Sequence, residues 1–150
     1  MAAVAQAVPE RLLELRVRRT GLLCAAAADS HDAALASALE KVSKDQIAAF
    51  NREDAAGTLA LAYTKSPTYD AAKAELAALF TATDAKAEQV GFQYIGHDDE
   101  FAVARVKVKV TAPGTVGFQD NVVDTLTIFH QEGGRWKPWD VYVLGSTFLE

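Results

Sequence analysis

The sequence predicts an α+β domain in which three helices precede a strongly curved, mostly antiparallel sheet that folds around them as a cone. Apolar side chains first recur with the helical period of about 3.6 residues, and from Glu88 onward with a period of two. Two runs rich in β-branched and aromatic residues then flank Gly133-Gly134, which is a strong hairpin signal. Helices followed by consecutive strands indicate helices packed on one side of an antiparallel sheet.

The helical part divides into three segments. The first begins after Asp29-Ser30, either of which can cap a helix, and ends near Asn51. A short second helix follows with Glu53 and Asp54 in its first turn, where carboxylates favour the positive end of the helix dipole. Ser66-Pro67 marks a break before the third helix. The apolar positions at helical spacing are Leu35, Leu39, Val42, Ala49 and Phe50 in the first helix and Tyr69, Ala72, Leu76, Leu79 and Phe80 in the third.

Alternation predicts the strands that follow. Val90, Phe92 and Tyr94 alternate with polar or small residues, and a turn at residues 97–100 leads into a second strand over residues 101–110. In that strand alanine and valine oppose Arg105, Lys107 and Lys109, as expected for a strand with one face in water. Ala112-Pro113-Gly114 ends it, and the last hairpin spans residues 121–149.

Size and charge limit the classes of partner. At 150 residues the chain is most simply one domain, residues 30–150, preceded by an extension over residues 1–29. A net charge of −5 argues against nucleic acid or an anionic membrane surface, and no apolar run approaches the ~20 residues of a membrane span. Cys24 is the single cysteine, and three scattered histidines have no zinc-ligand spacing, so neither a metal nor a cofactor is expected.

Two interpretations remain open for the N-terminal extension. Arg18-Arg19, a short apolar run and the small residues up to Ala28 are typical of a signal sequence, although the run is short and begins about twenty residues into the chain. A plain helix from Glu10, with Pro9 in its first turn, is the alternative, and it favours a cytoplasmic location.

The two interpretations predict different mature proteins. Export predicts that the mature chain begins near Asp29, so that mass spectrometry of protein from the native host finds a loss of about 28 residues. An intact N-terminus in that material would contradict export and favour the helix.

The order of the predicted elements and three short motifs carry a family resemblance. The motifs are residues 50–55 (Phe-Asn-Arg-Glu-Asp-Ala), Tyr63 before the Ser-Pro break, and residues 132–137 (Glu-Gly-Gly-Arg-Trp-Lys). Over residues 30–149 the chain resembles the NTF2-like superfamily, in particular its SnoaL-like and uncharacterised bacterial branches. The resemblance implies the cone-shaped α+β fold but leaves function open, because this fold hosts enzymes, transport factors and assembly domains.

A tight turn at Gly133-Gly134 predicts which residues of the last hairpin pair. It places Glu132 opposite Arg135, Thr127 opposite Asp140 and Leu126 opposite Val141. One face then mixes hydroxyls, a carboxylate and aromatic rings, as small-molecule pockets do, and the other is almost purely apolar. The ligand-pocket candidates are Tyr63, Thr125, Thr127, Trp136 and Tyr142, and the dimer-interface candidates are Leu126, Ile128, Trp139, Val141 and Val143.

Asp140 is the single candidate for a catalytic residue, although a structural role that satisfies a polar position is the stronger expectation. The first expectation for function is therefore a domain that binds a small, largely apolar ligand or serves as a homodimeric accessory protein. The alternative is a cofactor-independent isomerase, cyclase or hydrolase of the SnoaL-like kind. In that enzyme Asp140 would act as general acid or base, oriented by Thr127 or Tyr142.

Overall fold

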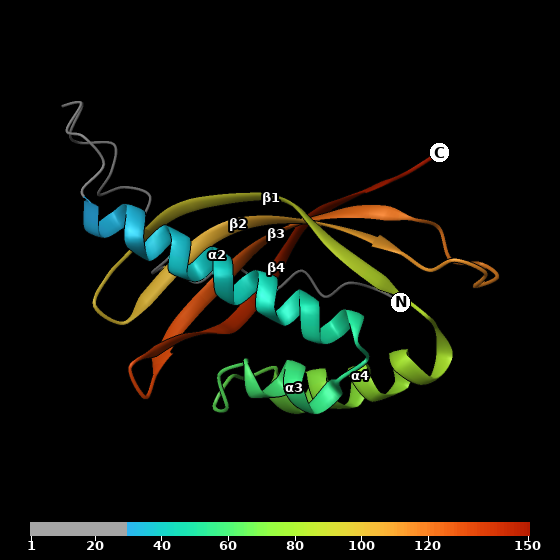
Figure 1. Cartoon of the computed structure of the whole chain (residues 1–150), viewed down its shortest axis with the longest axis horizontal. Coiled ribbons are helices and arrows are strands. Elements are labelled where there is room, and N and C mark those ends of the chain that lie inside the picture. The colour runs from blue at the N-terminus through green and yellow to red at the C-terminus, as the bar shows by residue number, and fades with distance from the viewer. Residues whose placement is uncertain (1–29) are drawn as a thin grey trace.

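A computed structural model of the chain describes residues 30–150 and confirms the predicted α+β fold, with helices packed on a curved antiparallel sheet (Figure 1). Three helices come first: α2 (Ser30–Asn51), α3 (Ala55–Ala60) and α4 (Tyr69–Ala82). Four strands follow: β1 (Lys86–His97), β2 (Phe101–Thr111), β3 (Asn121–Glu132) and β4 (Arg135–Phe148). The extension predicted over residues 1–29, with Cys24, lies outside the described residues.

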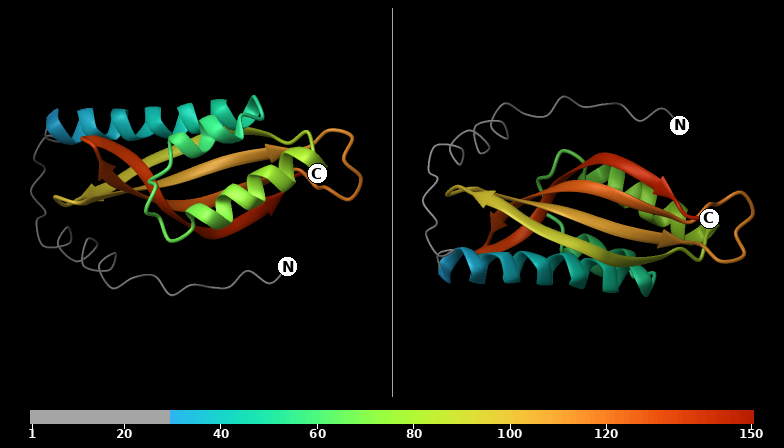
Figure 2. Two further views of the ribbon diagram at one scale, coloured as in Figure 1. Left: turned by 90° about the horizontal axis from the view of Figure 1, so that it is seen from below. Right: turned by 90° about the horizontal axis from the view of Figure 1, so that it is seen from above.

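The sheet is a curved, unclosed antiparallel meander in which each strand pairs with the next along the chain. All three helices lie on one side of it, as the two views of Figure 2 show. The turn at Gly133-Gly134 joins β3 to β4 with φ of 59° and 75°. Positive φ at both residues is what a two-residue hairpin turn needs to match the twist of its strands. No helix among residues 30–150 is long and apolar enough to span a membrane.

The core forms where α2 crosses the inner, concave face of the sheet. Leu35 and Leu39 of α2 pack on Ala102, Ala104 and Val106 of β2, together with Phe129 of β3. The side chains of Leu39 and Phe129 are completely buried. The small alanines of β2 let the helix approach the sheet closely, and the predicted helical and alternating patterns therefore meet in one core.

Two local predictions need correction. Val90 does not continue the inner face of β1, because a bulge at this residue shifts the register between Gln89 and Gly91, and Val90 is 49% exposed. Glu53 and Asp54 do not lie in the first turn of α3. Asp54 is instead its N-cap, accepting the Gly57 N–H at 2.7 Å, and Glu53 precedes it with a φ of 57°.

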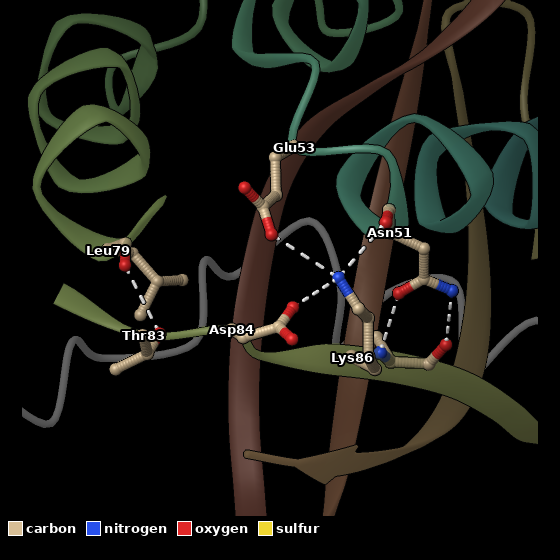
Figure 3. A network of polar contacts seen from close by, with 7 residues as sticks. Asn51, Glu53, Leu79, Thr83, Asp84 and Lys86 are labelled. Atoms are coloured by element: carbon tan, nitrogen blue, oxygen red, sulfur yellow. Dashed lines mark hydrogen bonds and ion pairs between the residues drawn. The ribbon is translucent and has the colours of Figure 1, made fainter. Parts of the chain in front are cut away.

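Asn51 joins the end of α2 to the start of the sheet (Figure 3). Its side-chain amide donates to the Ala87 carbonyl at 2.8 Å, and its side-chain oxygen accepts the Ala87 N–H at 2.7 Å. The ammonium of Lys86 donates to the Asn51 carbonyl and pairs with Glu53 at 3.3 Å and Asp84 at 2.5 Å. The Asn-Arg-Glu-Asp motif thus continues the hydrogen bonding of β1 beyond its edge and holds α2 over the sheet.

The segment between α3 and α4 covers part of the outer edge of β4. Tyr63 donates its N–H to the Pro138 carbonyl at 2.8 Å, and the Ser66 hydroxyl donates to the Trp139 carbonyl at 2.5 Å. Thr64 also donates to Glu132, whose carboxylate pairs with Lys137 at 2.7 Å. Hydrogen bonds from Lys137 and Thr64 lower the pKa of Glu132 to about 2. This carboxylate therefore stays ionised and ties the segment to the hairpin.

Replacing Asn51 tests the helix–sheet junction. Asn51→Ala removes both hydrogen bonds to Ala87 and leaves that part-buried peptide group without them, so we expect a loss of about 1–3 kcal/mol in the free energy of unfolding. Urea denaturation measures the loss. The matched control is Arg52→Ala, which truncates the exposed neighbour. Equal stability of the two variants would show that the Asn51 amide does not hold the junction.

Candidate functional site

A hollow of about 150 Å³ lies between the second half of α2 and the inner face of β2, β3 and β4. From α2 it is lined by Ser43, Gln46 and Ile47. From the strands it is lined by Val106, Val108, Thr125, Thr127, Phe129, Pro138 and Val141. The hollow thus begins where the packed core ends, since Val106 and Phe129 belong to both.

The lining of the hollow is apolar with a few uncharged polar groups. Ser43, Thr125 and Thr127 are each 8% exposed, and the Thr125 hydroxyl donates to the Val106 carbonyl at 3.0 Å. The hydroxyls of Ser43 and Thr127 and the amide of Gln46 are the other polar groups in the lining. None of its ten residues is ionisable, so the hollow is suited to holding a neutral molecule and offers no group for proton transfer at neutral pH.

The hairpin register departs from the prediction halfway along β4. Pairing follows the predicted register from Glu132–Arg135 to Phe129–Pro138. A bulge at Trp139 then inserts one residue, so that Ile128 pairs with Asp140 and Thr127 pairs with Val141. The predicted pairings of Thr127 with Asp140 and of Leu126 with Val141 are therefore wrong. One extra residue moves the side chains that follow it, up to Val143, to the other face, and a second irregularity before Gly145 shifts the register again.

The bulge places Asp140 on the outer face, across the strand from the hollow. Asp140 is 6% exposed, and its carboxylate accepts the N–H of Val141 at 2.8 Å and lies near the hydroxyl of Tyr142. Burial raises the pKa of Tyr142, and the hydrogen bond and charge of Asp140 raise it further. Asp140 therefore satisfies a polar position beside the tyrosine, and neither residue lines the hollow.

The other pocket candidates are distributed unevenly. Thr125 and Thr127 line the hollow, and Trp136 packs against the core on the same face. Tyr63 lies away from it, because its ring packs on His130 with centroids 4.6 Å apart. Of the five candidates, the structure therefore brings only the two threonines into the lining, with Trp136 nearby.

The dimer-interface candidates do not share one face as predicted. Ile128 and Leu126 stay on the outer face, where Ile128 is only 3% exposed within a single chain. Val141 and Val143 instead follow Thr127 and Thr125 onto the inner face, where they are 50% and 66% exposed. The bulge thus divides the set, and the homodimer stays a prediction without a continuous apolar surface made from these five residues.

A cluster of titratable groups that the sequence did not predict lies at the other end of the core. The Tyr94 hydroxyl is 2.5 Å from Nδ1 of His97, and the same nitrogen is 3.6 Å from Asp32 in the first turn of α2. Asp32 and Ser43 are eleven residues apart on α2, which corresponds to roughly 16 Å. Leu35 and Leu39 fill that interval, so this cluster does not reach the hollow. The described residues contain no group of His, Cys, Asp and Glu side chains suited to a metal ion.

The family model of the C-terminal domain of anti-sigma-I factor RsgI9 matches residues 41–149 of this chain, which include the second half of α2 and every later element. No curated protein matches the chain. The family model is therefore the comparison that shows to which family the chain belongs.

Several solved structures share the fold at low sequence identity. A scytalone dehydratase-like protein from Novosphingobium aromaticivorans is 16% identical, with a TM-score of 0.61 over 76% of this chain and 87% of that protein. A protein of unknown function from Mycobacterium tuberculosis is 12% identical, with a TM-score of 0.64 over 79% and 76%. A ketosteroid isomerase-like protein from Erwinia carotovora atroseptica is 15% identical, with a TM-score of 0.55 over 73% and 96%. At these identities the likeness establishes the NTF2-like fold alone.

The contact between Asp140 and Tyr142 predicts a measurable titration. Asp140→Asn removes the negative charge that stabilises the protonated phenol, so the pKa of Tyr142 should fall toward its ordinary value while the effect of burial remains. NMR titration of a ring-labelled sample measures it, with Asp124→Asn as the matched control at another carboxylate of the hairpin. An unchanged pKa of Tyr142 in Asp140→Asn would show that the two side chains do not interact.

Proposed function

We propose that this chain, which belongs to the family of the anti-sigma-I factor RsgI9 C-terminal domain, binds a small, largely apolar molecule without transforming it. The observation that carries the proposal is the composition of the hollow: three hydroxyls and one amide among apolar side chains, with no ionisable group. Ligand pockets commonly combine an apolar wall with a few convergent polar groups. Acid–base catalysis needs a titratable side chain within reach of the ligand, and this lining has none.

The volume of the hollow sets the size of the molecule. At about 150 Å³ it is well below the roughly 300–1,000 Å³ typical of sites for drug-sized ligands. It matches instead a cavity that takes one molecule the size of benzene. The part of the ligand held here is thus a single ring or a short aliphatic segment bearing a hydroxyl, carbonyl or amide group.

The position of Asp140 argues against the enzyme alternative. A general base must come within hydrogen-bonding distance of the group from which it takes a proton. Asp140 lies on the outer face of β4 and is held by Val141 and Tyr142, so a ligand in the hollow would be separated from it by the strand.

Filling the hollow tests the proposal. Benzyl alcohol, a single ring with one hydroxyl, should shift the backbone amide signals of the hollow in an NMR titration. Ser43→Phe places a ring in the hollow and should weaken this binding at least tenfold, because the site then has no room. Thr127→Val keeps the shape and removes one hydroxyl, so it should weaken binding about two- to tenfold.

The control is Val116→Phe, which adds the same ring at a fully exposed loop residue and should leave binding unchanged. Binding that survives in Ser43→Phe, with that variant folded by circular dichroism, would contradict the proposal. So would amide shifts confined to residues outside the hollow.

A further inference from the structure

The apolar surface of the hollow continues beyond it along β4. Val141 lines the hollow and is 50% exposed, and Val143, which follows on the same face opposite Thr125, is 66% exposed. From Val141 to Leu149 the sequence has no Asp, Glu, Lys, Arg or His. The inner face of this half of β4 is therefore an uncovered apolar surface, which we call the β4 extension, Val141 and Val143.

Helix α4 does not cover this part of β4, since Val141 and Val143 are exposed. The helix lies on the same side of the sheet as α2, as Figure 2 shows. Both ends of α4 are anchored. Ser66 bonds to Trp139 just before the helix, and the ring of Phe80 packs on Phe50 of α2 with centroids 5.3 Å apart. Between these anchors Ala72, Leu76 and Leu79 recur at helical spacing, and each of them is half-buried.

The apolar side chains of α4 are only half-buried, so they leave part of their surface in water, as the exposed valines of β4 do. Covering such surface is favourable because it removes apolar groups from water. The continuity of the β4 extension with the hollow indicates one occupant for both, because a molecule held at Thr127 reaches Val141 directly across the strand pair.

We infer that the ligand is an elongated neutral amphiphile of the class of medium-chain alcohols, esters and amides. Its uncharged polar head lies in the hollow beside Ser43 and Thr127, and its unbranched apolar chain follows Val141 and Val143. The head is uncharged because the lining offers no cation or anion to pair with it, and burying an unpaired charge is costly. This inference rests on the proposed function and names the ligand class of the same site.

A series of straight-chain alcohols from 1-butanol to 1-decanol tests the inference on the full chain by NMR titration. Each added methylene that is buried should strengthen binding about fourfold, and the gain should continue beyond the length that fills the hollow. The amide signals of Val141 and Val143 should shift with the longer alcohols and much less with 1-butanol. Decanoate at pH 7 should bind at least tenfold more weakly than 1-decanol, because its carboxylate would be buried unpaired.

A charge placed in the β4 extension distinguishes the binding of the ligand's apolar tail there from the binding of its polar head in the hollow. Val143→Asp changes an exposed residue and should weaken 1-decanol binding at least tenfold while leaving 1-butanol binding unchanged. Val90→Asp is the matched control, since Val90 is an exposed valine of β1, the strand at the other edge of the sheet, and it should affect neither alcohol.

The outcomes distinguish the two proposals. If 1-butanol binds in the hollow but affinity stops rising with chain length, or if Val143→Asp has no effect on 1-decanol, the inference is overturned and the proposed function stands. If decanoate binds as tightly as 1-decanol, the neutral head is wrong. If no alcohol binds in the hollow, both proposals fail.

Discussion

The single extra residue of β4 at Trp139 decides which chemistry the inner face of this fold presents. Without the bulge, Asp140 and Tyr142 would stand beside Thr127, and the site would combine a carboxylate with hydroxyls. With it, Val141 and Val143 take those positions, and the carboxylate turns to the outer face and holds Tyr142. A bulge is held in place by what surrounds it. Here the carbonyls of Pro138 and Trp139 accept hydrogen bonds from Tyr63 and Ser66, so the segment before α4 secures the irregular part of the strand.

The elements of the fold could be predicted from the sequence because their signals are local. The period of Leu35, Leu39 and Val42 defines α2, and the alternation from Ala102 to Val110 defines β2. The Gly-Gly turn gives the first pairs of the last hairpin correctly. Side-chain pattern and backbone geometry agree in these segments, so the sequence alone is sufficient there.

The candidate site could be predicted only in part, because local signals do not show where a strand bulges or how a helix crosses the sheet. Thr125 and Thr127 line the hollow, whereas the pairs that the turn predicts from Asp140 to Val143 are displaced by one position. A bulge leaves no reliable trace in an apolar run such as residues 141–144, because valine, tyrosine and leucine suit either face. The contribution of α2 to the hollow, and the approach of His97 to Asp32, depend on how the helix crosses the sheet, and no local spacing encodes that crossing.

The meander also has a consequence for how the chain folds. Every strand pairs with its immediate neighbour in sequence, so each hairpin can close over a short loop without waiting for distant segments. The contacts of α2 are different, because this helix precedes the whole sheet and packs on β1 and β4 at opposite edges. During synthesis α2 emerges before every strand, and its apolar side has no complete sheet to cover it until β4 leaves the ribosome. Completion of the core is therefore the late step of folding, set by the longest-range contacts in the domain.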